Sequence, residues 1–208
     1  EIMKNDLTEG RMAFEKQLDI MCAGAFSVSN DSDLKWVYFL DGLKDGDNNI
    51  AALIRCNDML RQTFADSEHY QNYSVIMKNE LIFRKSGMVV GDKFFYDNYC
   101  TYQNTDFETW RKQSFESNTW QLFPLEEIDT GERTFQAMTF SYPVRNYIQQ
   151  EPEANAVVQF LLSKENLEQM FGQLLSRQGG ILIYDAEDRL LASLGKINAD
   201  GDDPENTD

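Results

Sequence analysis

The chain has 208 residues, of which 42% are hydrophobic and 12% aromatic, so it can bury a substantial core. Its net charge is −16, and a surface this acidic repels phosphate backbones and anionic lipid headgroups. We therefore expect no direct contact between this segment and nucleic acid.

The sequence contains no apolar run long enough to span a bilayer, and its first residues lack the apolar region of a signal peptide. The chain opens with Glu1 rather than Met. We therefore expect a fragment of a longer protein, with any membrane segments outside the fragment.

A long helix is predicted over residues 4–24. Its apolar residues recur about every 3.5 positions, with an interruption at Gly10: Met3, Leu7, Phe14, Leu18, Met21 and Ala25. This spacing fits a helix that pairs with a helix of a second copy. It fits equally well a helix that packs on its own domain.

Residues 30–40 fit either a short helix or a strand, and a second helix is predicted over 49–66. The polar turn between them places Asp45, Asp47 and Asn49 with the spacing of a calcium loop. However, Ile50 stands where that loop requires glycine, and its twelfth position carries no Glu. We expect no metal there.

The middle of the chain changes to β-prone sequence. A hairpin is predicted with strands near 74–78 and 81–85 and a turn at Asn79-Glu80. Thr105 and Glu108 have capping-box spacing, which predicts a helix over 105–117.

Two further strands are predicted near 133–143 and 156–162. A helix begins at Ser163 and ends at Gly179-Gly180, and a hairpin turning at Ala186-Glu187 follows. Strands joined by hairpins, with helices grouped at one side, predict an α+β domain built on an antiparallel sheet.

The sequence shows no motif of a hydrolase, a nucleotide-binding loop or a zinc site. His69 is the single histidine, and we expect it to be an exposed polar residue. Cys22, Cys56 and Cys100 match no metal-ligand spacing and are interpreted as buried small hydrophobes. We expect no enzymatic activity, no cofactor and no metal.

Aromatic residues are concentrated between positions 94 and 123, among polar neighbours. Aromatic rings mixed with polar groups suit a concave ligand site, although they also suit loops packed on a sheet. We expect a pocket over the sheet, walled by this segment, with these ligand-binding candidates: Tyr96, Asp97, Tyr99, Trp110, Arg111 and Trp120.

The order of several short motifs resembles a known family. These motifs are "NYSVIMKNELIFRKSG", "FFYDNYCTYQNTDFETWRKQSF", "WQLFPLEEI", "FQAMTFSYPV", "AVVQFLLSKENLEQMF" and "GGILIYDAEDRLLASLG". Together they are similar to the extracytoplasmic sensor segments of Gram-positive membrane-bound AraC-type transcriptional regulators, which carry double Cache domains. The resemblance covers roughly residues 1–197.

The resemblance implies a PAS-like Cache fold, with a long N-terminal helix followed by an antiparallel sheet flanked by helices. It implies a signalling and dimerisation helix (1–27), a membrane-distal module (28–175), and the start of an incomplete membrane-proximal module with an acidic tail (176–208). Phe107, Glu108, Trp110, Phe123 and Pro124 belong to the fold-defining pattern.

Two departures from the family pattern stand out. Arg189 occupies the position of a glycine in the last hairpin, so we expect a looser turn. The Y…R…W pattern of amino-acid-binding members is not matched, because Arg111 follows Trp110, and an amino-acid ligand is therefore not implied.

The function implied by the resemblance is extracytoplasmic sensing of a small molecule for a transmembrane transcriptional regulator, with a homodimer formed through the first helix. The ectodomain of a sensor histidine kinase or of a chemoreceptor is the alternative. A secreted glycan-binding or hydrolytic domain is a third hypothesis.

Overall fold

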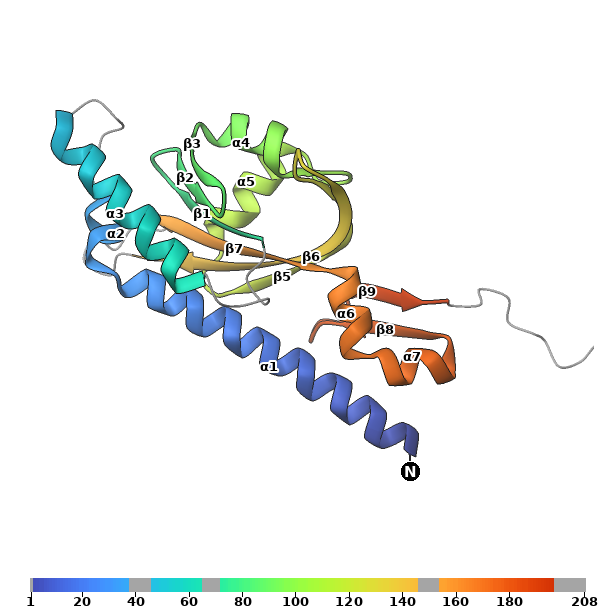
Figure 1. Ribbon diagram of the computed structural model, residues 1–208. Helices are drawn as coiled ribbons and strands as arrows, with labels where there is room; N and C mark the ends of the chain where they lie inside the picture. Colours follow the sequence, from blue (N-terminus) through green and yellow to red (C-terminus); the bar gives the residue numbers. More distant parts are fainter. Residues whose placement is uncertain (1, 38–45, 65–71, 146–153, 197–208) are drawn as a thin grey trace, which may run out of the picture.

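The computed structural model describes residues 2–37, 46–64, 72–145 and 154–196 (Figure 1). The helices in these ranges are α1 (Ile2–Asn30), α2 (Ser32–Val37), α3 (Gly46–Phe64), α4 (Asp92–Tyr99), α5 (Phe107–Glu116), α6 (Lys164–Met170) and α7 (Gly172–Gln178). The strands are β1 (Tyr73–Met77), β2 (Leu81–Arg84), β3 (Gly87–Val90), β4 (Thr101–Tyr102), β5 (Gln121–Asp129), β6 (Thr134–Val144), β7 (Ala156–Ser163), β8 (Gly180–Tyr184) and β9 (Leu190–Gly195).

In this part of the chain, seven strands form one antiparallel sheet in the order β3-β2-β1-β7-β6-β5-β4. The first hairpin joins the rest of the sheet where β1 pairs with β7, with Val75 opposite Val158. The sheet curls strongly along β5 and β6 (Figure 1). The four strands predicted near 74–78, 81–85, 133–143 and 156–162 are confirmed.

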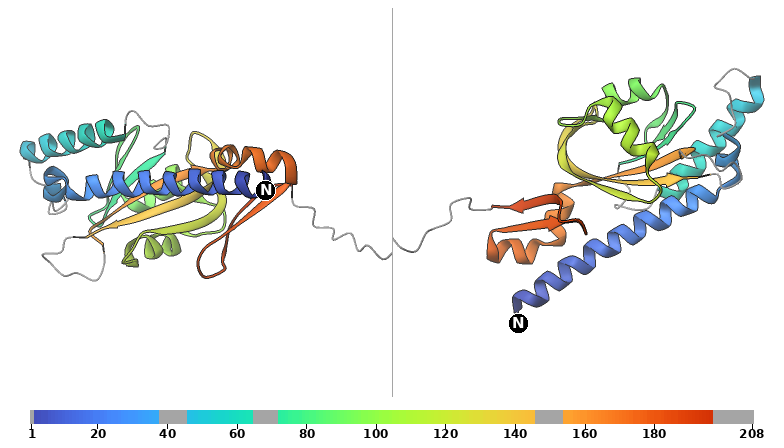
Figure 2. Two further views of the ribbon diagram at one scale, coloured as in Figure 1. Left: turned by 90° about the horizontal axis from the view of Figure 1, so that it is seen from below. Right: turned by 180° about the vertical axis from the view of Figure 1, so that it is seen from behind.

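The two faces of the sheet support two separate cores, because successive strand residues point to opposite faces. Val75, Phe83 and Phe160 belong to the core formed with α1, α2 and α3. Ile76 and Val157 belong to the core formed with α4 and α5. Figure 2 shows α1 and α3 on one side of the sheet and α5 on the other.

Helix α1 is six residues longer at its C-terminus than predicted. Met21 and Ala25 are fully buried in the α1–α3 core, whereas Leu7 is 50% exposed. The C-terminal half of the helix therefore packs on its own domain. The N-terminal half runs beside α7, where Arg177 Nη1 lies 2.5 Å from Oδ2 of the buried Asp6 (Figure 2).

The cap of α5 differs from the prediction. Asp106 is the N-cap residue, and its side chain accepts a hydrogen bond from the Thr109 N–H at 2.8 Å. The Thr105 hydroxyl instead donates to Glu126 Oε1 at 2.9 Å. The predicted Thr105–Glu108 capping box is therefore wrong by one residue, because Thr105 is used to connect the helix to β5.

The helix predicted from Ser163 is also interrupted. The helix starts where predicted, with Ser163 as its N-cap accepting from the Asn166 N–H, but it breaks at Phe171 and resumes as α7. Leu167, Phe171 and Leu174 are buried on both sides of this break.

Strand β5 and helix α4 are two of the elements that were not predicted. Strand β5 contains Pro124, which normally argues against a strand, but a register shift between Phe123 and Glu126 frees this position from the ladder. Residues 92–99, which overlap the aromatic segment expected to wall a pocket, form α4. Of the segment 30–40, which fitted either a helix or a strand, residues 32–37 are helical. His69 and Asp45 lie outside the described residues.

The last hairpin, β8–β9, forms a sheet of its own and turns at the predicted residues. The expectation that Arg189 would loosen this turn is wrong. Asp185 accepts hydrogen bonds from the backbone N–H groups of Glu187 and Arg189, and Arg189 Nε donates to Asp185 Oδ2 at 2.6 Å.

Candidate functional site

The α4–α5 layer is held on the sheet by buried polar contacts. The Tyr102 hydroxyl and the Thr139 hydroxyl are 2.9 Å apart, and Gln159 Nε2 donates to Ser114 Oγ at 2.9 Å. These bonds join β4 to β6 and α5 to β7. The layer is therefore a fixed part of the domain and not a loop resting on it.

Tyr96 and Trp110 form the interior of this layer. Both are buried, and their ring centroids lie 5.4 Å apart. The Tyr96 hydroxyl donates to the Thr105 carbonyl oxygen, and burial raises the pKa of Tyr96. Their burial in the second core makes both residues part of the scaffold.

Trp110 also lines a small cavity of about 100 Å³ between α5 and β5. Its indole N–H is buried and has no acceptor among the described residues. Glu126 lines the same cavity, but its carboxylate already accepts from the Asn104 N–H and the Thr105 hydroxyl. The cavity has room for a few atoms only.

Asp97 and Arg111 are engaged in ion pairs. Asp97 is exposed and pairs with Lys93 one turn earlier in α4. Arg111 pairs with Asp92, the first residue of α4, and its guanidinium lies 5.0 Å from the centroid of the Phe115 ring. The Arg111–Asp92 pair connects α5 to α4.

Trp120 lies elsewhere, in a groove of about 710 Å³ between β5 and the β8–β9 hairpin. Its ring stacks on Phe140 at 5.7 Å with an interplanar angle of 22°, and 45% of the residue is exposed. Tyr184 and Leu122 also line this groove.

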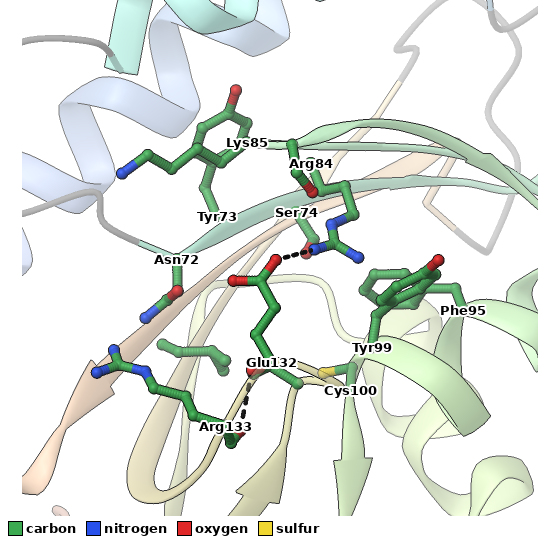
Figure 3. Close-up of a pocket in the computed structure, with 13 residues that line it drawn as sticks. Asn72, Tyr73, Ser74, Arg84, Lys85, Phe95, Tyr99, Cys100, Glu132 and Arg133 are labelled. Atoms are coloured by element: carbon green, nitrogen blue, oxygen red, sulfur yellow. Dashed lines mark hydrogen bonds and ion pairs between the residues drawn. The ribbon is translucent and has the colours of Figure 1, made fainter.

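Tyr99, the remaining predicted residue, lines a cavity of about 490 Å³ at the C-terminal end of α4 (Figure 3). The structure thus does not gather the six predicted residues in one pocket. Ligand binding by any of them stays a prediction.

The cavity at Tyr99 exists because the sheet curls. Arg84 ends β2, and Glu132 lies in the β5–β6 turn, three strands away in the sheet, yet Arg84 Nη2 and Glu132 Oε1 are 3.2 Å apart (Figure 3). Gly131, at φ +75°, lets this turn touch α4, since a Cβ atom there would overlap the Asn98 carbonyl oxygen. The turn thus closes over the end of the sheet.

The lining of the cavity is polar and cationic. Arg84, Lys85 and Arg133 contribute three positive charges, and Glu132 contributes one negative charge. The Arg84 guanidinium carbon lies 4.0 Å from the Tyr99 ring centroid, and that of Arg133 lies 4.5 Å from the Phe135 ring centroid. Each guanidinium group thus lies over an aromatic ring in a cation–π contact.

The groups around this cavity favour binding over chemistry. Burial raises the pKa of the Cys100 thiol to about 12, so the sulfur stays protonated and is a poor nucleophile at neutral pH. Burial also raises the pKa of Tyr73. Among the described residues no group of His, Cys, Asp and Glu side chains is arranged to hold a metal ion.

Sequence reasoning missed the cationic residues of the cavity. Arg84 ends β2, Lys85 follows it and Arg133 directly precedes β6, in a chain that is otherwise strongly acidic. That enrichment at two turns was the available signal. Their proximity depends on the curl of the sheet, which the sequence pattern does not reveal.

Comparison with known proteins gives a likeness of fold. The periplasmic sensory domain of the Campylobacter jejuni chemoreceptor Tlp1 superimposes with a TM-score of 0.51 at 12% identity, covering 93% of this chain and 74% of that one. The sensory domain of C. jejuni Tlp3 with isoleucine bound gives a TM-score of 0.44 at 15% identity, covering 90% and 73%. The Tlp3 ligand-binding domain with L-norvaline gives 0.43 at 15%, covering 89% and 71%.

The chain has the fold of the Tlp1 sensory domain. The predicted fold class, a PAS-like Cache fold with a long N-terminal helix and an antiparallel sheet flanked by helices, is confirmed. No protein-family model and no curated protein sequence matches the chain. Across residues 2–37, 46–64, 72–145 and 154–196, no helix has both the length and the apolar character of a membrane span.

Proposed function

We propose that this chain is an extracytoplasmic ligand-sensing domain, in which a small molecule bound at the curled end of the sheet changes the packing of α1. The observation that carries the proposal is the relation between the cavity and the long helix. The cavity and the core that contains part of α1 lie on opposite faces of strands β1 and β2.

Strand β2 illustrates this relation. Arg84 contributes to the cavity, whereas its neighbour Phe83 is fully buried in the core that α1 shares with α3. On β1, Ser74 lines the cavity and Val75 lies in the same core as Phe83. A ligand that alters the position of these strands therefore acts on the core to which Met21 of α1 also belongs.

Signalling requires that the ligand bind one of two arrangements of α1 more tightly than the other. A packed interior resists gradual deformation, so a small shift of the sheet favours a change between discrete packings. A long helix that extends beyond the sheet is suited to carry such a change away from the ligand site (Figure 2).

The parent protein that we propose is a membrane-bound AraC-type transcriptional regulator of a Gram-positive bacterium, from the resemblance of the sequence motifs. The ectodomain of a chemoreceptor or histidine kinase is the alternative, favoured by the likeness of fold to Tlp1. In either case the domain acts outside the cytoplasm, and enzymatic activity is not part of the proposal. A secreted glycan-binding domain remains the third candidate, for which the exposed Trp120 is the supporting feature.

We also propose a division of the chain into a signalling helix (1–27), a membrane-distal module (28–175) and the beginning of a second module (176–208). The separate β8–β9 sheet supports the second boundary. Leu7 and Met12 are exposed on α1 and support its proposed role in homodimer formation.

The test is a thermal-shift screen of sugars, amino acids and small organic acids, followed by calorimetry on the hits. Tyr99→Ala and Trp120→Ala distinguish binding in the Tyr99 cavity from binding in the groove between β5 and the β8–β9 hairpin, because each variant removes an aromatic side chain from one of the two sites. A hit weakened by the Tyr99 change and unaffected by the Trp120 change supports the proposal. Absence of any stabilising solute would contradict a sensing role.

A further inference from the structure

The ion pair between Arg84 and Glu132 is unusually asymmetric. The Arg84 side chain is 15% exposed, whereas that of Glu132 is 74% exposed, and the two residues are 48 positions apart in sequence. The carboxylate is drawn in the middle of the cavity, beside Arg84 and below Ser74 (Figure 3). An exposed, flexible carboxylate thus reaches inward to a nearly buried guanidinium.

This pair is poorly explained as a structural connection. Exposed glutamates lose side-chain entropy on pairing and contribute little to stability. The β5–β6 turn already has its own bonds, from the Thr130 N–H to the Arg133 carbonyl and from the Gly131 N–H to Asp129 Oδ1. Glu132 is therefore not needed to hold the turn.

The guanidinium, by contrast, is prepared for a planar oxyanion. It has five N–H donors, and Glu132 Oε1 accepts at one nitrogen, Nη2. It also lies over the Tyr99 ring. Lys85 and Arg133 add positive charge around the same cavity, and the hydroxyl of Ser74 adds a further donor. Carboxylates and phosphates are the groups that such a fork of donors recognises.

We propose that the cavity binds a small solute through a carboxylate or phosphate group held by Arg84, and that Glu132 occupies this position when the solute is absent. The solute displaces the Glu132 carboxylate, which can swing outward to solvent. This inference rests on the proposed sensing function and specifies the chemical class of its ligand. It also explains how a chain of net charge −16 attracts an anion.

The experiment is titration calorimetry of the whole chain with citrate, malate, inorganic phosphate and glucose 6-phosphate, with glucose and glycerol as neutral comparisons. Carboxylates and phosphates are tested separately, so the results also assign the oxyanion. The variants are Arg84→Gln and Glu132→Gln. Their controls are Arg11→Gln and Glu15→Gln, an exposed ion pair on α1 at 2.8 Å that makes the same charge changes outside the cavity.

Arg84→Gln should weaken binding of the preferred anion about ten-fold or more, as expected for loss of a charge-assisted hydrogen bond. Glu132→Gln should tighten it about two- to six-fold, because an exposed internal competitor is removed. The Arg11 and Glu15 variants should bind like the parent. A gain of affinity in Glu132→Gln cannot arise from misfolding, so it tests the proposal even if Arg84→Gln is unstable.

Weaker or unchanged anion binding in Glu132→Gln would overturn the proposed displacement. Binding of a neutral solute in the cavity, with no response to any anion, would overturn the oxyanion class and leave the sensing function standing. If no solute of any class binds, the sensing function itself fails.

Discussion

Gly10 of α1 lies directly against the ring of Phe171, at the break between α6 and α7. A Cβ atom at Gly10 would be 2.7 Å from Cε1 of that ring and closer still to Cδ1. Phe171 is buried in the core on the α1 side of the sheet. The glycine that interrupts the apolar repeat of the helix is thus a position where α1 and the C-terminal helices make close contact.

Gly10→Ala should therefore destabilise the chain, although alanine is the better helix former. We expect overpacking against Phe171 to cost about 1–3 kcal/mol in the free energy of unfolding. Gly172→Ala is the matched control, because a Cβ atom there meets nothing within 4 Å and should be neutral or stabilising. Urea unfolding of the parent, Gly10→Ala and Gly172→Ala measures the difference. Equal unfolding midpoints for the parent and Gly10→Ala would contradict this contact.

Trp110 should tolerate loss of its N–H but not of its ring. Trp110→Ala empties the second core and should cost about 3–5 kcal/mol. Trp110→Phe should cost much less, because the buried indole N–H has no described acceptor to lose. A comparably large loss in both variants, measured by chemical unfolding, would show that the N–H is satisfied.

Stability should fall at alkaline pH because of Cys100. Burial raises the pKa of this thiol to about 12, whereas the thiol in the unfolded chain titrates near pH 9. Between these values the folded state keeps a proton that the unfolded state has lost, so rising pH favours unfolding.

Cys100→Ala should flatten the decline in unfolding free energy between pH 8 and 10.5. When the folded state binds one proton more than the unfolded state, the unfolding free energy falls by about 1.4 kcal/mol per pH unit. Tyr102, whose pKa burial also raises, leaves part of the slope in place. Parallel pH profiles for the parent and Cys100→Ala would rule out this assignment.

Self-association, if it runs through α1, should depend on the exposed residues of the helix. Phe14 and Leu18, part of the predicted seam, pack partly against the core and are unsuitable probes. Leu7→Glu with Met12→Glu should abolish weak dimers in sedimentation experiments without changing the unfolding midpoint. Met88→Glu, on the partly exposed β3, is the control. A parent chain that is monomeric at millimolar concentration would show that α1 serves its own domain alone.

Much of the fold followed from the sequence because its signals are local. The turn at Asn79-Glu80 and the cap at Ser163 are read from a few adjacent residues, and both are found in the structure. Strand β5 was missed because Pro124 contradicts the local pattern, and only its position at a register shift makes it acceptable.

The candidate site was less predictable because it is not local. The aromatic cluster correctly indicated a layer over the sheet, but aromatic residues such as Tyr96 and Trp110 are buried within it. The cavity depends on Arg84 and Glu132, which meet only after the sheet curls. No residue spacing in the sequence predicts this curvature of the sheet.

The central claim is that occupancy of the cavity changes the packing of α1 through the sheet, and amide hydrogen exchange tests it most directly. The chain would be measured alone and saturated with the tightest-binding solute from the screen. We expect slower exchange in β2, α4 and the β5–β6 turn, together with altered exchange in the half of α1 that contains Met21. Protection confined to the cavity, with exchange in α1 unchanged, would contradict the account.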